Sequence, residues 1–208
     1  MLKILFIDSV TTGMNPDRCA IYRIGGIFTE NGEETKRFEL RMRPFPGAQI
    51  RDRSLDICGE SRATLARYPS QEEAFADFIS LLNEQVNLNN PKDKIFIGGF
   101  NTDRFEYTFL REWFHRNGNE RFRDYFFVQT IDLMSLANFA VLQRRNLLPD
   151  FTLETAARQI GVHCPGDDRY ECITNSRVCL DMFYSVAKRF GVDEFKESPA
   201  IKEIFKNF

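Results

Sequence analysis

The first 43 residues restrict the fold most strongly, because they hold three strand signals in succession. The apolar run Leu2–Ile7, which ends at Asp8, is typical of a buried strand. Two further strands are predicted over Ile21–Phe28 and Thr35–Arg43, and the Asn31-Gly32 pair between them is a strong hairpin signal. The chain is therefore predicted to begin with antiparallel strands of one sheet.

The rest of the chain has mainly helical patterns. Ser70 and Glu73 have the spacing of a capping box at the start of a helix, and Lys94–Gly99 reads as a fourth strand. Further helices are predicted after Asn101 and over Asp132–Leu142, Thr152–Ile160 and Ser176–Phe190. Strands followed by helices predict an α/β fold, with a mixed β-sheet flanked by helices in a single domain.

Composition narrows the class of protein. With 208 residues, 43% hydrophobic and 28% charged, the chain suits one globular domain over residues 1–190 and a tail over 191–208 that is a possible docking helix or partner site. The net charge of −2 neither predicts nor excludes a nucleic-acid binder. The five cysteines, without a CxxC pair, indicate reduced thiols. No apolar run reaches membrane length, so a cytoplasmic protein without a membrane partner is expected.

Three segments carry the functional signal: Phe6–Pro16, Gly98–Leu110 and Ser176–Asp181. In order and spacing they resemble the three motifs of the DnaQ-like 3′–5′ exonuclease family, whose active members follow the DEDDh pattern. The resemblance covers roughly residues 2–190. It implies an RNase H-like exonuclease fold and a hydrolase that cuts nucleotides from the 3′ end of a nucleic acid.

The resemblance also implies a metal-binding site. In the family, two Mg²⁺ or Mn²⁺ ions held by carboxylates drive phosphodiester hydrolysis. Asp8, Glu106 and Asp181 match the positions of these catalytic and metal-binding carboxylates, with Glu106 in place of the usual Asp. Mg²⁺ or Mn²⁺ is therefore the expected cofactor if the protein is active.

Two expected catalytic residues are missing at the matched positions. Val10 stands where the family has a glutamate, and valine has no ligand atom. Ser176 stands where the family has a histidine, the general base that takes a proton from the attacking water. The only histidines, His115 and His163, lie outside the motif.

The resemblance assigns binding of the 3′-terminal nucleotide to Thr11, Thr12, Gly13 and Met14. The alternative for these residues is a tight turn followed by a methionine in the core. Asn101 is interpreted either as a substrate contact or as the cap of the helix that follows it.

Three functions remain open from the sequence. The first is an impaired or inactive exonuclease kept for binding single-stranded nucleic acid or protein. The second is an active metal-dependent 3′–5′ exonuclease with an altered metal site. The third is a protein-interaction scaffold with no nucleic-acid role.

Overall fold

The computed structural model describes residues 1–165 and 171–192. Its N-terminal part is a three-stranded antiparallel unit, made of β1 (Lys3–Thr11), β2 (Ile21–Glu30) and β3 (Glu33–Arg41). Asn31 and Gly32 both have positive φ, 49° and 93°, as a two-residue hairpin turn requires. The predicted hairpin is confirmed.

Two parallel strands complete the sheet. β4 (Phe96–Gly99) pairs with β1, and β5 (Ile131–Asp132) pairs with β4. The strand order is β3-β2-β1-β4-β5, so β1 lies at the centre of a mixed sheet. The predicted fold class is confirmed, although the short strand β5 carries no local signal from which the sequence could predict it.

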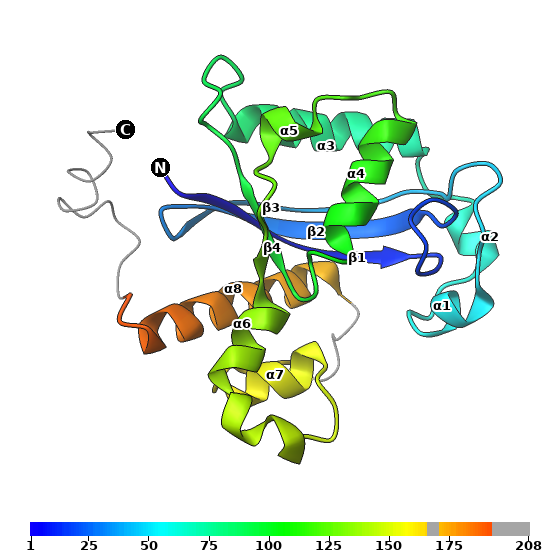
Figure 1. Ribbon diagram of the computed structural model, residues 1–208. Helices are drawn as coiled ribbons and strands as arrows, with labels where there is room; N and C mark the ends of the chain where they lie inside the picture. The colour runs from blue at the N-terminus through cyan, green and yellow to red at the C-terminus, as the bar shows by residue number, and fades with distance from the viewer. Residues whose placement is uncertain (166–170, 193–208) are drawn as a thin grey trace.

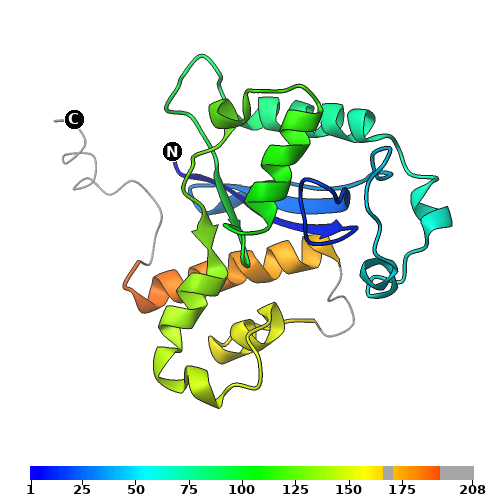
Figure 2. The ribbon, with the colours of Figure 1, turned by 45° about the vertical axis from the view of Figure 1, so that its right-hand side comes forward.

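Helices cover both faces of this sheet (Figure 1, Figure 2). α3 (Gln71–Gln85) and α4 (Glu106–Arg116) lie on one face, and α6 (Leu133–Ala140), α7 (Leu153–Gln159) and α8 (Cys172–Arg189) lie on the other. Ser70 and Glu73 form the predicted capping box of α3. The remaining helices are short: α1 (Asp52–Asp56), α2 (Arg62–Leu65), α5 (Phe122–Tyr125) and the 3₁₀ helix η1 (Leu142–Leu147).

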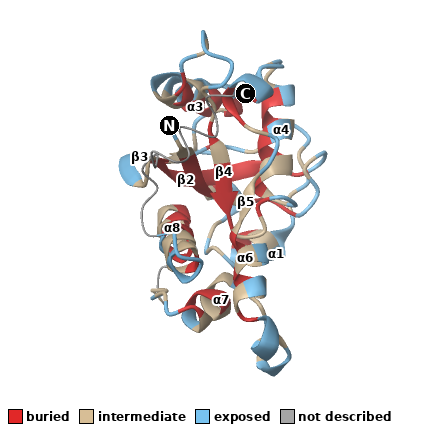
Figure 3. Ribbon diagram, turned by 60° about the vertical axis from the view of Figure 1, so that its left-hand side comes forward, coloured by how far each residue is buried: buried red, intermediate tan, exposed pale blue. Residues whose placement is uncertain are grey.

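The alternation of side chains along β1 separates two cores. Leu5 and Ile7 point towards α3 and α4, where they join an aromatic cluster that includes Phe78. Ile4 and Phe6 point towards α8, into a core of smaller side chains. Figure 3 shows the buried residues concentrated between these layers. Asp8 continues the second series, which aims its carboxylate at the α8 side.

Other features of the chain bear on the remaining predictions. The five cysteines are all free thiols, as expected. No helix among residues 1–165 and 171–192 combines the length and apolar character that crossing a membrane needs. The predicted tail, 191–208, lies outside the described residues apart from Gly191 and Val192.

Candidate active site

Asp8 lies where β1 passes the first turns of α8. Its partner in the neighbouring strand β2 is Gly25, and a Cβ there would come within 2.8 Å of the Cys172 Cβ on α8. The missing side chain of Gly25 therefore lets α8 approach the sheet beside Asp8. Asn175, one turn into α8, donates its amide Nδ2 to Asp8 Oδ2 at 3.2 Å.

Glu106 brings a second carboxylate to Asp8 from the other side of the sheet. It is the first residue of α4 and is 4% exposed, and its Oε2 has no hydrogen-bond partner among the described residues. Burial raises its pKa well above the ordinary range, and the negative charge of Asp8 raises it further. Both effects favour the protonated form of Glu106.

The pKa of Asp8 is raised less than that of Glu106, because Asp8 has hydrogen-bonding and charged partners. Burial raises the pKa of Asp8 to about 6. The hydrogen bonds of the Asn175 amide and the Cys172 thiol, and the charge of Arg23, act in the opposite direction and lower it. The two carboxyl groups thus lie near each other, Glu106 buried at the start of α4 and Asp8 partly buried on β1. They hold less negative charge there than two ordinary carboxylates would.

Asp132 is a residue of the site that the sequence does not indicate. It caps α6 by accepting from the Met134 N–H, and the same Oδ1 accepts from the Asn101 N–H at 2.9 Å. Its charge also contributes to the raised pKa of Glu106. The only local signal is its place just before a helix, which is equally typical of an ordinary N-cap.

Asn101 itself is not a helix cap. α4 has Phe105 as its N-cap, without any side-chain cap bond. Asn101 has a φ of 65°, and its carbonyl accepts from the Arg104 and Phe105 N–H groups in the turn that precedes α4. The predicted capping role is wrong, and the substrate contact remains a prediction.

The structure does not bring Asp181 to the other two carboxylates. Asp181 is exposed and lines a surface cleft with Arg37 and His163. It follows Asn175 by six residues, and at about 100° per residue this places it on a different face of α8. Cys179, one turn after Asn175, is the residue of this segment whose pKa is raised by burial and by the charges of Asp8 and Glu106.

Ser176 also differs from its predicted place. It is fully buried, and its hydroxyl donates to the Gly25 carbonyl at 3.1 Å, so it fastens α8 to the sheet instead of facing a substrate. Both differences follow from how α8 packs on the sheet, with Asn175 turned towards Asp8 and Ser176 turned towards Gly25. With Asn175 beside Asp8, the matching histidine position, five residues earlier, is Tyr170, which lies outside the described residues.

Val10 takes part in apolar packing. It lies on the same face of β1 as Asp8 and contacts a small cluster made of Tyr22, Leu55 and Leu65. Its side chain has no oxygen that could bind an ion beside Asp8.

The predicted nucleotide-binding segment forms a fixed turn after β1. The Thr11 hydroxyl donates to the Gly13 carbonyl at 2.6 Å, and the Thr12 hydroxyl donates to the Gln49 carbonyl and accepts from the Ala20 N–H. Both threonines are buried, so their side chains hold the turn. Met14 is 68% exposed, which contradicts the alternative of a core methionine.

Comparison with known proteins assigns the chain to a family. A family model described as Exonuclease, RNase T, matches residues 5–174. The chain belongs to the RNase T exonuclease family. The match ends in the first turn of α8, before Ser176 and Asp181.

Individual relatives are distant. The PolC-type DNA polymerase III of Thermotoga petrophila is 24% identical over 202 residues, which are 95% of this chain and 13% of the polymerase. Escherichia coli exonuclease I, solved as a zinc-bound complex with single-stranded DNA, superposes with a TM-score of 0.71 at 19% identity, over 91% of this chain and 41% of that one. Its complex with a dT13 oligonucleotide gives a TM-score of 0.70 at 18% identity, over 90% and 41%. The chain therefore spans less than half of each.

Proposed function

We propose that this domain binds the 3′ end of a single-stranded nucleic acid and hydrolyses it poorly or not at all. The observation that carries the proposal is the Asn175 amide on Asp8, at the place where α8 meets the site. The Asn175 amide is neutral and donates to Asp8, whereas an aspartate at this place would add a second negative charge and two oxygens for a cation.

Members of the family use divalent metal ions. A pair of such ions does not fit the residues of this site. Val10 offers no oxygen, the neutral amide of Asn175 donates its nitrogen to Asp8, and burial raises the pKa of Glu106. Among the described residues no three acidic, histidine or cysteine side chains are grouped as a metal site. Too few carboxylates remain to offset two divalent charges.

The proposed binding of a strand end is supported by the turn after β1. The turn that Thr11 and Thr12 hold presents Gly13 and Met14, whose N–H groups have no backbone acceptor among the described residues. Such N–H groups suit a phosphate or a terminal hydroxyl. The exposed Met14 side chain is suited to pack against a terminal base. Exonuclease I, which has the same fold, is solved with single-stranded DNA.

An assay of end-labelled single strands tests the loss of hydrolysis. DNA and RNA labelled at the 3′ or the 5′ end are incubated with Mg²⁺ or Mn²⁺, beside the Asp8→Ala variant. We expect no shortening beyond the background of Asp8→Ala. Shortening from the 3′ end that disappears in Asp8→Ala would contradict this half of the proposal and favour an active exonuclease with an altered metal site.

Fluorescence anisotropy of labelled single strands at low salt tests binding, because phosphate contacts are strongest there. Met14→Ala is expected to weaken binding by roughly tenfold, about 1.4 kcal/mol. The matched control is Leu147→Ala, since Leu147 is 81% exposed and lies in η1, away from the turn. An equal loss in both variants, or no binding by the parent protein, would favour a scaffold without a nucleic-acid role.

A further inference from the structure

The side chain of an arginine lies across the turn that follows β1. A Cβ on Gly13 would come within 3.4 Å of the Arg51 Cδ and 3.5 Å of the Arg51 Nε, so this side chain occupies the space that the glycine leaves free. Arg51 is itself exposed, and the next residue of the turn, Met14, is exposed as well. A solute that contacts Met14 therefore meets this arginine beside it.

Hydrogen bonds fix the backbone of Arg51 against the turn. The Arg51 N–H donates to the Thr12 carbonyl at 2.9 Å, and the Thr12 hydroxyl donates to the Gln49 carbonyl at 2.7 Å. Between these two contacts, the Ile50 carbonyl accepts from the Arg62 guanidinium at 2.9 Å. The arginine side chain thus starts from a fixed point, although the two segments are far apart in sequence.

The charge of Arg51 is available to a ligand. Within residues 1–165 and 171–192 no carboxylate forms an ion pair with it, and the neighbouring Asp52 pairs with Arg62 instead, at 2.9 Å. The Gly13 and Met14 N–H groups have no backbone acceptor in the same part of the chain. Guanidinium and backbone N–H groups are the donors with which proteins contact phosphate oxygens. Donors of both kinds, close together and unused, form a site for a phosphate group.

We propose that Arg51 binds a phosphate group of the strand whose end lies against Gly13 and Met14. This inference rests on the proposed function and names a residue that supplies positive charge to the strand end. Each base is joined through its sugar to a phosphate, so a base packed on Met14 places a phosphate near the turn. That phosphate is either the last phosphodiester of a strand with a 3′-hydroxyl or a terminal 3′-phosphate.

Fluorescence anisotropy of a labelled single strand, measured over a range of salt concentrations, tests this contact. Arg51→Gln removes the charge and keeps a polar side chain, and we expect it to weaken binding at low salt by roughly tenfold. A lost phosphate contact also releases fewer counterions. The slope of log K against log salt should therefore become shallower by about 0.7.

Arg123→Gln is the matched control, because Arg123 is also exposed and the variant loses the same charge. Arg123 belongs to α5, which lies beside the start of β4, at the opposite end of the sheet from the turn. Its salt slope should equal that of the parent protein. Arg51→Lys keeps the charge without the planar fork, so it should keep the salt slope and lose part of the affinity. Circular dichroism checks that each variant is folded.

Equal effects of Arg51→Gln and Arg123→Gln on a strand that the parent protein binds would overturn the inference and leave the proposed function standing. No binding by the parent protein would contradict both. Strands that end in a 3′-hydroxyl or a 3′-phosphate then identify the phosphate. An equal loss for both strands in Arg51→Gln assigns Arg51 to the phosphodiester, and a loss confined to the 3′-phosphate strand assigns it to the terminal group.

Discussion

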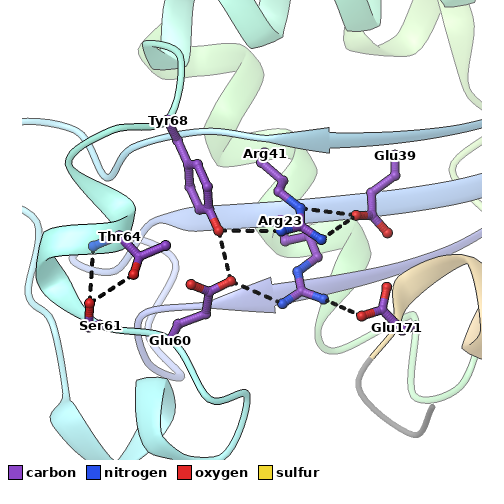
Figure 4. A network of polar contacts seen from close by, with 8 residues as sticks. All are labelled: Arg23, Glu39, Arg41, Glu60, Ser61, Thr64, Tyr68 and Glu171. Atoms are coloured by element: carbon purple, nitrogen blue, oxygen red, sulfur yellow. Dashed lines mark hydrogen bonds and ion pairs between the residues drawn. The ribbon is translucent and has the colours of Figure 1, made fainter.

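Two groups of buried charges on one molecule reach a low net charge by different means. Asp8 and Glu106 have no basic side chain in hydrogen-bond contact among the described residues, and burial raises the pKa of both. Arg23, on the same sheet face as Asp8, and Glu60 are both less than 10% exposed and form a direct ion pair (Figure 4). Proton binding therefore reduces the negative charge of the first pair, whereas in the second pair a basic side chain offsets the charge of Glu60.

This difference predicts how each group responds to change. The stability contribution of a pair neutralised by a proton changes with pH, and replacing one carboxylate by an amide removes the cost of its charge. A pair neutralised by a side chain is insensitive to pH near neutrality, and removal of one partner leaves a buried charge exposed to a low dielectric. The free energy of unfolding of matched variants measures both responses.

The largest effect is expected from Arg23→Ala. It leaves the buried Glu60 carboxylate without its cation, so we expect a loss of about 3–5 kcal/mol in the free energy of unfolding. The control is the double variant Arg23→Gln with Glu60→Gln, which removes both charges and keeps polar side chains of similar size. Urea denaturation measures both. Equal losses in the two variants would show that the packing of Arg23, and not its charge, stabilises the fold.

The next effect has the opposite sign and depends on pH. The folded pKa of Asp8, about 6, lies above its ordinary value of 3.8, so between these values the folded chain holds a proton that the unfolded chain releases. The contribution of Asp8 to stability is therefore complete below about pH 4 and is lost as the pH rises through 6. Asp8→Asn should be more stable than the parent by on the order of 2–3 kcal/mol at pH 8.

Denaturation curves from pH 4 to 8 check this sign. The difference between Asp8→Asn and the parent protein should shrink towards zero at pH 4. A constant difference across the range would mean that Asp8 does not titrate in this window. The same measurement on Asp52→Asn is a useful control, because the Asp52 side chain is 77% exposed and lies in α1, apart from both groups.

The sequence predicts the features of the fold that neighbouring residues encode. The hairpin at Asn31-Gly32 and the capping box at Ser70 are each encoded within a few residues, and both are confirmed. The first strand also follows from its apolar run, although β1 continues past Asp8 to Thr11. These local signals are sufficient to predict the fold class.

The third motif is misplaced in the sequence prediction because the start of α8 has no strong local signal. Glu171, its N-cap, makes no side-chain cap bond, and its carboxylate instead reaches Arg23 on β2. A contact between residues so far apart in sequence is invisible to periodicity. The same limit hides Asn175 and Asp132, whose partners Asp8 and Asn101 lie on other elements.

A smaller change in the free energy of unfolding is expected from removing a single tyrosine hydroxyl, and its size should depend on whether the hydrogen-bond acceptor is charged or neutral. Tyr68→Phe removes the hydroxyl that donates to Glu60, and Tyr125→Phe removes one that donates to the neutral Asn83 amide, each at 2.8 Å. Hydrogen bonds to charged groups contribute more, so we expect a loss of about 1.5–2 kcal/mol for Tyr68→Phe and about 1 kcal/mol for Tyr125→Phe. Urea denaturation at pH 7 compares them. A larger loss for Tyr125→Phe would mean that Glu60 has little charge to stabilise.

The smallest effect is expected at an ion pair that water already solvates. Asp52 and Arg62 lie in α1 and α2, and their side chains are 77% and 57% exposed. Because solvent and salt screen such a pair, Asp52→Asn should change the free energy of unfolding by less than about 0.5 kcal/mol. Raising the salt concentration to about 1 M should remove even this difference. Glu60 lies two residues before Arg62, so a large effect of Asp52→Asn would mean that the charges of this segment act as one network, and burial would no longer explain why Arg23 matters.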